Sequence, residues 1–227
     1  MRHYLNSRKV RRNVIISRGL SYGGLGIMAI GLVVSLRQAA PLDAVLGLFF
    51  VGMVASQIGL PMRNRWDRHP RIDEVLDSSM KGLDERFAIF HYTLGSSHAL
   101  FCPGGVFALL PRLEDGKYEY RDGDWIRTWT GRGRLRRGGT RKLGGIDREA
   151  AVEAERLRKG LVKKLGPDEA PAVHAFVVFL HSAAEVRSDG APTPATHLKK
   201  LKEAVRKLPK GASLSDSQLA RLSGNRA

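Results

Sequence analysis

The chain has one cysteine, Cys102, in 227 residues, which excludes an intramolecular disulfide framework and a cysteine-rich zinc site. Acidic residues are also few, because 22 Asp and Glu stand against 38 Lys and Arg, for a formal net charge of +16. The excess is +9 in residues 1–71, with 11 basic and 2 acidic side chains, and +7 in residues 72–227, with 27 and 20. A chain that is basic throughout indicates an anionic neighbour, either lipid headgroups, nucleic acid or both.

Charged residues are absent from two long stretches, residues 19–36 and 44–62, of 18 and 19 residues. As a helix each would span roughly 27 to 29 Å, about the thickness of the hydrocarbon core of a bilayer. We therefore predict a transmembrane helical hairpin over residues 19–62. It follows a basic N-terminus (1–18) and precedes a domain (63–222) and a short tail (223–227).

The charges that flank the predicted hairpin set its orientation. The connecting loop balances Arg37 against Asp43, whereas both outer flanks are strongly basic. By the positive-inside rule both termini are expected in the cytoplasm. The flanking basic residues are Arg2, Arg8, Lys9, Arg11, Arg12 and Arg18 before the hairpin, and Arg63, Arg65, Arg68 and Arg71 after it.

Two other interpretations of the apolar stretches are open. A secretory signal peptide explains the basic start, but cleavage after Ala40 would place Gln38 three positions before the cut and Pro41 directly after it. A signal peptide also leaves the second stretch unexplained. A helical hairpin buried in a soluble protein is the other alternative, although soluble helices usually keep one polar face.

Small residues recur at a spacing of four within both stretches, which favours close helix contact within the hairpin or between two copies of it. The equal alternative is that glycine is simply common in membrane helices. The pairs are Gly19 and Gly23, Gly52 and Ser56, and Ala55 and Gly59.

After the hairpin, hydrophobic periodicity and turn residues predict an α/β domain. A first helix leads into short strands that form an antiparallel meander, and a second helix precedes an apolar run typical of an inner strand. Asp147 is expected to cap the second helix, and Ser215 with Gln218 forms a capping box for the last one. The expected helices are 69–87, 147–165, 198–208 and one from 215; the expected strands are 87–93, 98–102, 106–110, 117–120 and 175–180; residues 187–197 are expected to be a loop.

This order of elements resembles the nuclease-related domain (NERD) family over about residues 70–222. The segment GGVFALLPR, residues 104–112, resembles the turn and third strand of that family, and Gly123, Asp124 and Trp125 resemble its later Gly-x-Trp motif. The resemblance implies a restriction-endonuclease-like, mixed-sheet α/β domain after the transmembrane hairpin. Two spans ahead of such a domain also resemble the arrangement of bacterial membrane proteins, which implies the inner membrane of a bacterium as the location.

The catalytic pattern of the family does not carry over to this chain. Its Asp position falls on Ser97, its Glu position on Leu110 and its Lys position on Arg112; only the carboxylate of the first helix has a match, in Glu74. Such nucleases need hard oxygen ligands for Mg²⁺ and a lysine that positions the attacking water. The resemblance therefore argues for the fold and against hydrolysis.

A relocated metal site is the alternative, with Glu114, Asp115 or Glu119 supplying carboxylates from the next turn, although acidic turn residues are usually just solvated. The seven histidines include no pair spaced for a metal site on a helix, and the chain has no P-loop, hydrolase elbow or kinase signature. We therefore expect no catalytic residue, no metal and no cofactor.

The strongest remaining feature is the segment 127–142, which has seven basic residues, no acid and interspersed glycines, with Trp125 and Trp129 at its start. Guanidinium groups bind phosphates and indoles stack on bases, so nucleic-acid binding is one interpretation. Docking on anionic lipid is a second, and a solvated basic loop with Trp125 in the core is a third. The candidate residues for phosphate or headgroup binding are Trp129, Arg132, Arg134, Arg136, Arg137, Arg141 and Lys142, with Lys199 and Lys200 from a basic helix.

From the sequence we thus expect a membrane-anchored, catalytically inactive nuclease-like domain that acts as a binding module, with nucleic acid as a candidate ligand. One alternative is a divergent metal-dependent nuclease that uses Glu74 with Glu114 or Glu119. Another is a membrane scaffold that binds a protein, a second copy of itself or anionic lipid.

Overall fold

In the computed structural model, the described residues are 1–227 except 39, 130–137, 209–210, 212–213 and 224–227. The chain forms two compact units. One is Asn6–Ile72; the other combines Met1–Leu5 with Asp73–Ala227. We call them the hairpin unit and the α/β unit.

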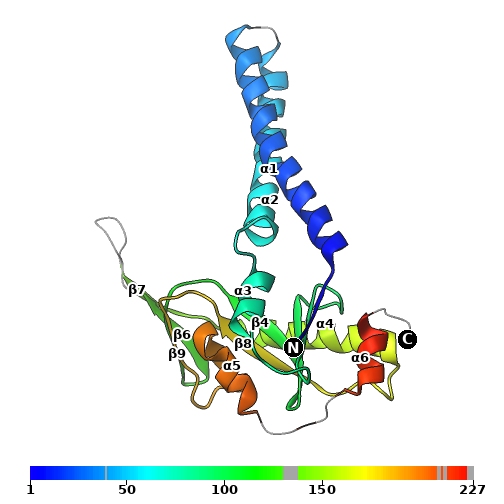
Figure 1. Ribbon diagram of the computed structural model, residues 1–227. Coiled ribbons are helices and arrows are strands. Elements are labelled where there is room, and N and C mark those ends of the chain that lie inside the picture. The colour runs from blue at the N-terminus through cyan, green and yellow to red at the C-terminus, as the bar shows by residue number, and fades with distance from the viewer. Residues whose placement is uncertain (39, 130–137, 209–210, 212–213, 224–227) are drawn as a thin grey trace. The chain divides into compact units, whose positions relative to one another are not determined.

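The hairpin unit contains α1 (Ser7–Leu36) and α2 (Leu42–Trp66) (Figure 1). Both helices are long and apolar enough to span a membrane. The Asn6 side chain caps α1 by accepting a hydrogen bond from the backbone N–H of Lys9 at 3.0 Å. Helix α1 therefore begins twelve residues before the apolar stretch at residue 19 and includes basic residues of the predicted N-terminal flank.

The two helices of the hairpin unit approach closely at small residues. A methyl group added at Gly24 would lie 2.6 Å from the carbonyl oxygen of Gly52, and one added at Gly59 would lie 2.8 Å from the carbonyl carbon of Leu20. The predicted close helix contact is therefore present within the hairpin around Gly52, Ser56 and Gly59. It does not extend to Gly19 and Gly23, where an added methyl group meets nothing within 4 Å.

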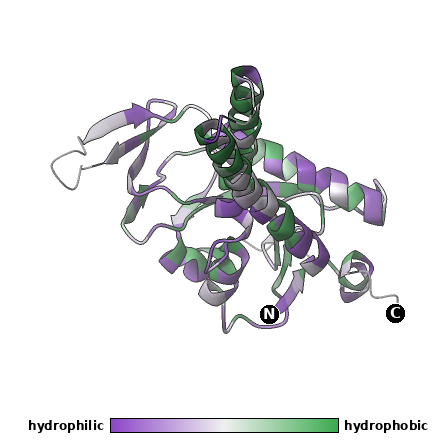
Figure 2. Cartoon of the chain, turned by 90° about the horizontal axis from the view of Figure 1, so that it is seen from above, coloured by the Kyte–Doolittle hydropathy of each residue, from purple (hydrophilic) through white to green (hydrophobic). Residues whose placement is uncertain are grey.

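Large exposed apolar side chains are concentrated on these two helices, which are mostly green in Figure 2. Among the described residues, Leu5 and Val152 are the only large apolar side chains that are exposed elsewhere. Only 17% of the most apolar window of α1 and 22% of that of α2 are buried. The hairpin therefore lacks the burial that the soluble alternative requires, and soluble proteins rarely expose so large an apolar surface.

The α/β unit is built on a six-stranded sheet in the order β1-β2-β3-β4-β8-β10. Strands β2 to β4 form the first three strands of the predicted antiparallel meander, but the predicted fourth, at 117–120, belongs to a second sheet. Strand β1 pairs with β2, β4 with β8 and β8 with β10 in parallel. The strands are β1 (Arg2–Leu5), β2 (Ala88–His91), β3 (His98–Cys102), β4 (Gly105–Arg112), β8 (Val173–Phe179) and β10 (Ala195–His197).

A second sheet of four strands has the order β7-β6-β5-β9, and β5, β6 and β7 are antiparallel neighbours. Its strands are β5 (Gly116–Arg121), β6 (Asp124–Trp129), β7 (Gly139–Lys142) and β9 (Ala184–Arg187). The helices of the unit are α3 (Ile72–Ser79), α4 (Ile146–Leu165), α5 (Leu198–Arg206) and α6 (Asp216–Ser223).

Helix α4 covers one face of the larger sheet. Its Leu157 and Leu161 pack in one core cluster with Ala99 of β3 and Ala108 of β4. Leu110, two residues further along β4, lies on the same face because strand side chains alternate. His91 and His98 lie on the opposite face of the sheet, because their neighbours in sequence, Phe90 and Ala99, point toward α4 and strand side chains alternate.

Strand β1 was not expected, because residues 1–18 were interpreted only as a basic flank. It pairs with β2 over Arg2–Leu5, and the ring of Tyr4 stacks on Phe90 with centroids 4.3 Å apart. The chain therefore enters the hairpin from the α/β unit and returns to the same unit after it. A signal peptide cleaved after the first apolar stretch would remove a strand of this sheet, which argues against that alternative.

Other predicted elements are confirmed with different ends. Helix α3 ends at Ser79, eight residues before the predicted end. Ser78 and Ser79 donate hydrogen bonds back to the carbonyls of Val75 and Leu76, and Gly82 then adopts a φ of +81°. The predicted loop 187–197 contains the short strand β10.

The cap of α4 was predicted at the wrong residue. Gly145 is the N-cap, and the Asp147 side chain makes no capping hydrogen bond. The capping box of α6 is confirmed, because Gln218 N–H donates to Ser215 Oγ at 3.3 Å and Ser215 N–H donates to Gln218 Oε1 at 3.0 Å.

Candidate anion-binding surface

The basic segment predicted to bind anions is in part a β-ribbon formed by β6 and β7. In the pairing register, Arg127 of β6 lies opposite Arg141 of β7, and Trp129 lies opposite Gly139. Arg127 also lies opposite Tyr118 of β5. Because side chains alternate along strands, these residues share one face of the smaller sheet.

The inner end of this face is part of the core. Trp125 is 1% exposed and packs with Tyr118, Phe179 and Ile146. The Tyr118 hydroxyl donates to the carbonyls of Glu114 and Asp115, and burial raises its pKa to about 12. Trp125 therefore anchors the ribbon and is not available to stack on a ligand, as the third interpretation of the segment expected.

Arg127 is held in place by the turn before β5. Its Nε donates to the carbonyl of Asp115 at 2.8 Å, and its Nη2 donates to Asp115 Oδ1 at 2.8 Å. Its guanidinium lies 5.2 Å from the ring centroid of Trp129, which is a cation–π contact. The ribbon therefore presents an arginine that is already ordered.

Arg141 faces Arg127 directly and is exposed, and it has no ion pair within the part of the chain that the structure describes. Like charges directly opposite on paired strands are destabilising. The ion pair of Arg127 with Asp115 offsets part of this repulsion, and an anion bound beside Arg141 would offset the rest. The two opposed guanidinium groups are therefore the candidate anion-binding geometry on the ribbon.

The partly exposed indole of Trp129 is fixed by glycine on the neighbouring strand. A methyl group added at Gly139 would lie 2.8 Å from Cζ2 of Trp129, so the indole packs directly over the backbone of β7. Sequence analysis identified Trp129 but not Gly139, which positions the indole, and it considered Asp115 as a metal ligand and not as the partner of Arg127. The glycine-rich composition of the segment was the available signal, and it was interpreted as a loop.

On the other face of the ribbon the cations have acidic partners. Lys142 Nζ lies 3.2 Å from Asp124 Oδ2, and Lys117 Nζ lies 3.1 Å from Glu185 Oε2. Lys142, one of the predicted site residues, therefore lies on the opposite face of the ribbon from Arg141, and Asp124 partly neutralises its charge. Lys199 and Lys200 are exposed at the start of α5, on a separate element whose Leu201 and Val205 are buried. Arg132, Arg134, Arg136 and Arg137 lie outside the described residues.

The positions that match the nuclease pattern lie against α4. The backbone N–H of Ser97 donates to Glu153 Oε2 at 3.2 Å, and Arg112 Nη2 donates to Glu149 Oε2 at 2.8 Å. Leu110, between them on the same face, packs against the core cluster that contains Trp125. This region holds ion pairs and a leucine where the family pattern places metal ligands.

The alternative carboxylates are not gathered into a metal site. Glu74 is on α3, whose Asp77 contacts the opposite face of the sheet at His91. Glu114 lies in the turn before β5, 3.8 Å from Arg112, and Glu119 pairs with Arg121 on β5. Across the described ranges, no three His, Cys, Asp or Glu side chains form a group that could hold a metal ion.

No protein-family model, curated protein or solved structure matches the chain. The site must therefore be interpreted from its own geometry.

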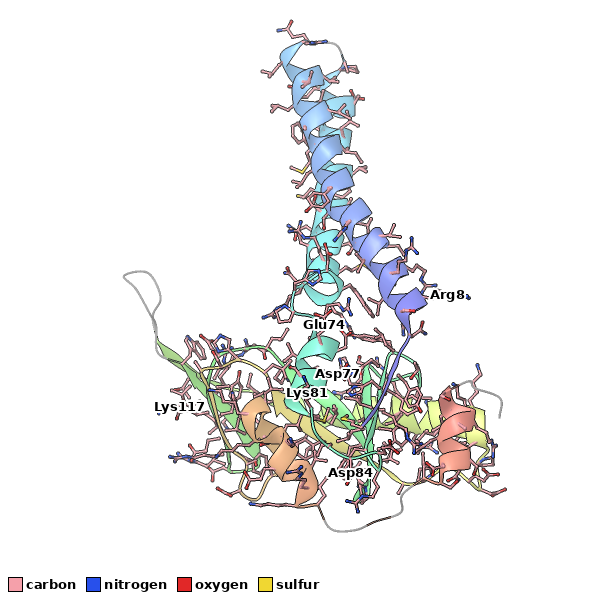
Figure 3. All side chains as sticks on the ribbon, in the orientation of Figure 1. Arg8, Glu74, Asp77, Lys81, Asp84 and Lys117 are labelled. Atoms are coloured by element: carbon pink, nitrogen blue, oxygen red, sulfur yellow. The ribbon has the colours of Figure 1, made fainter. Side chains whose placement is uncertain are left out.

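One polar cluster was not predicted at all. His91 and His98 are each 1% exposed and form a hydrogen bond between their Nδ1 atoms at 2.7 Å. Asp77 Oδ1 lies 3.0 Å from His91 Nε2 and 2.8 Å from His3 Nδ1. Figure 3 labels Asp77 on α3, beside Glu74. The sequence signal for this pair was the antiparallel pairing of the two predicted strands, which places His91 opposite His98 across the β2–β3 turn.

Burial of Asp77 favours its neutral form, but the hydrogen bonds from His91 and His3 outweigh this, so its pKa is held below its ordinary value. The carboxylate links β1, β2 and α3 of the α/β unit. A cavity of about 540 Å³ lies beside it, lined by residues that include His3, Asp77 and Lys81. The cluster therefore holds these three elements of the unit together, and one side of it is open to solvent.

Proposed function

We propose that this chain is a binding module anchored in the inner membrane of a bacterium, with its α/β unit in the cytoplasm. The unit binds nucleic acid through the face of the ribbon that carries Arg127, Trp129 and Arg141. It has the restriction-endonuclease-like fold of the nuclease-related domain family without that family's hydrolytic activity.

The anchoring is supported by the two apolar helices and their charge pattern. Their large apolar side chains are exposed along both helices, as expected for helices in lipid. The ends that lead into the α/β unit are basic, whereas the connecting loop balances Arg37 with Asp43. The positive-inside rule then assigns the α/β unit to the cytoplasm.

The fold assignment is supported by the order and pairing of the elements from α3 to β8. A helix and three antiparallel strands are followed, after the strands β5 to β7 of the second sheet, by a helix and a strand parallel to the third strand. This is the order that the resemblance to the nuclease-related domain family implies.

The loss of hydrolytic activity is supported by the residues at the pattern positions. Leu110 offers no ligand to a hard cation, and Arg112 is engaged by Glu149. An arginine is also too basic to exchange a proton with water near neutral pH. The domain therefore binds without cleaving.

The single observation that carries the binding proposal is the directly opposed pair Arg127 and Arg141 beside the partly exposed indole of Trp129. Guanidinium groups donate in pairs to phosphate oxygens, and a base stacks on an indole. A lipid headgroup uses the phosphate contacts alone, so the indole held at the end of β6 favours nucleic acid. The sequence between β6 and β7 contains four more arginines, which lie outside the described residues.

The test uses the full chain in nanodiscs of uncharged phosphatidylcholine and a fluorescent single-stranded DNA of about 30 nucleotides. The double variant Arg127→Gln with Arg141→Gln is expected to raise the Kd by about tenfold, since each guanidinium binds one phosphate. The matched control, Arg158→Gln with Lys159→Gln, removes the same charge from α4 and is expected to leave the Kd within about twofold.

Equal weakening in both variants contradicts the assignment to the ribbon. No DNA binding by the wild type, with binding to vesicles of phosphatidylglycerol that the ribbon variant loses, supports the lipid alternative. Metal-dependent cleavage that Glu74→Ala abolishes would support the divergent-nuclease alternative.

A further inference from the structure

The first part of α1 lies outside the apolar stretch and carries five basic residues. At 1.5 Å per residue, a helix of 30 residues is about 45 Å long, against about 30 Å for the hydrocarbon core. About 15 Å of α1 therefore extends beyond the core of a bilayer. The basic residues identify Ser7–Arg18 as the extending end, and Arg8 lies at its start (Figure 3).

The hairpin unit has few acids to neutralise these cations. Its sequence contains only Asp43, in the first turn of α2, and Asp67, which directly follows α2. Asp67 is already occupied by Arg18, whose Nη2 and Nε donate to its two oxygens at 2.6 and 2.9 Å. In the described chain, Arg8, Arg11 and Arg12 are exposed and have no ion pair.

The same helix face places apolar groups next to these arginines. Arg11, Arg12 and Ile15 follow Arg8 by three, four and seven residues, so all four lie toward one side of α1. Ile15 is 62% exposed, although it is separated from Arg12 by less than one turn. A phospholipid offers both required surfaces, a phosphate for the guanidinium groups and acyl chains for isoleucine.

We infer that Arg8, Arg11 and Arg12, the basic collar of the hairpin unit, bind the headgroups of anionic phospholipids in one leaflet. The opposite end of the hairpin has no such surface, since Arg37 there is balanced by Asp43. This inference rests on the proposed membrane insertion. It does not depend on nucleic-acid binding, which belongs to Arg127 and Arg141 of the other unit.

The experiment reconstitutes the full chain into phosphatidylcholine bilayers that contain brominated phosphatidylglycerol or brominated phosphatidylcholine. Bromine on the acyl chains quenches tryptophan near the bilayer, and Trp66, at the end of α2, is the one tryptophan in the hairpin sequence. Quenching against lipid fraction gives the association constant of each lipid relative to the other. The wild type is expected to associate with phosphatidylglycerol about fivefold or more strongly than with phosphatidylcholine. This is the preference that one basic residue near an anionic surface contributes.

The variant Arg8→Gln, Arg11→Gln, Arg12→Gln is expected to bring this preference close to one, whereas the lysine variant at the same three positions keeps it. The ribbon variant Arg127→Gln with Arg141→Gln keeps the full preference. Equal association of both lipids with the wild type, or an unchanged preference in the glutamine variant, overturns the inference while leaving the anchoring intact. Absence of quenching by either lipid overturns the anchoring itself and the inference with it.

Discussion

His3 and Asp77 are joined by a hydrogen bond with 2.8 Å between Nδ1 and Oδ1, although one residue precedes both apolar helices in the chain and the other follows them. The same carboxylate contacts His91, so strand β1 is joined to the α/β unit by side chains as well as by its pairing with β2. The apolar helices are thus an insertion between the first strand of a sheet and the rest of its fold. Under the proposed anchoring, a hairpin with both ends in one folded unit crosses the membrane an even number of times.

This connectivity predicts the accessibility of both chain ends. Epitope tags placed before Met1 and after Ala227 are expected to be cleaved by protease in inverted inner-membrane vesicles and protected in intact spheroplasts. Both ends behave alike because β1 and the remainder of the α/β unit fold together. Cleavage of one tag from each side would contradict both the hairpin topology and the inclusion of β1 in the sheet.

Replacement of Gly139 tests the role of the indole on the ribbon. In Gly139→Ala the new methyl group would meet Trp129 Cζ2 at 2.8 Å and displace the ring. Since stacking of a base on an aromatic ring contributes about 1–3 kcal/mol, DNA affinity is expected to fall about fivefold or more. Gly144→Ala is the matched control, because its methyl group meets only Asp124 Oδ1 at 3.8 Å. Equal affinities of the two variants would show that Trp129 makes no contact with the ligand.

Replacement of Gly59 tests the close packing of the hairpin. The added methyl group in Gly59→Ala would lie 2.8 Å from the backbone carbon of Leu20, which cannot move without shifting α1. Overpacking of this kind costs about 1–3 kcal/mol, so the thermal unfolding of the full chain in detergent is expected at lower temperature. Gly26→Ala, where nothing lies within 4 Å, is expected to leave it unchanged. A destabilised Gly26 variant would mean that the exposed face of α1 is also packed.

The buried hydroxyl of Tyr118 predicts a dependence of stability on alkaline pH. Its pKa is raised from an ordinary value of about 10 to about 12 by burial, so the unfolded chain loses this proton first. The resulting contribution to stability is fully present below about pH 10 and is lost as the pH rises to about 12. The stability difference between wild type and Tyr118→Phe is therefore expected to narrow across this range, as measured by denaturant unfolding at each pH. A difference that does not change would place the hydroxyl in contact with solvent.

The elements that sequence analysis predicted are those whose signals are local. The apolar stretches, the stripe of α4 and the run Ala175–Leu180 follow from periodicity and length alone, and the capping box of α6 follows from Ser215 and Gln218. Strand β1 has no such signal in its four residues. It forms a strand because Tyr4 packs against Phe90, which is more than eighty residues away in the chain.

The candidate site was also predicted only where the sequence signal is local. Composition identified Arg141 and Trp129, but the order of the ribbon depends on Asp115 and Gly139, which matter only once β5, β6 and β7 are paired. The histidine pair was missed for the same reason, since His91 and His98 meet only across an antiparallel turn. Spacing rules for helical metal sites do not detect such pairs.

The measurement that tests the central proposal most directly is the affinity of the full chain for single-stranded DNA across a salt series, with and without Mg²⁺. The account predicts that log K falls linearly with log salt with a slope of about −1.4 or steeper, the value for two phosphates on single-stranded DNA, and that the DNA stays intact. Affinity that does not depend on salt, or cleavage of the DNA when Mg²⁺ is added, would contradict it.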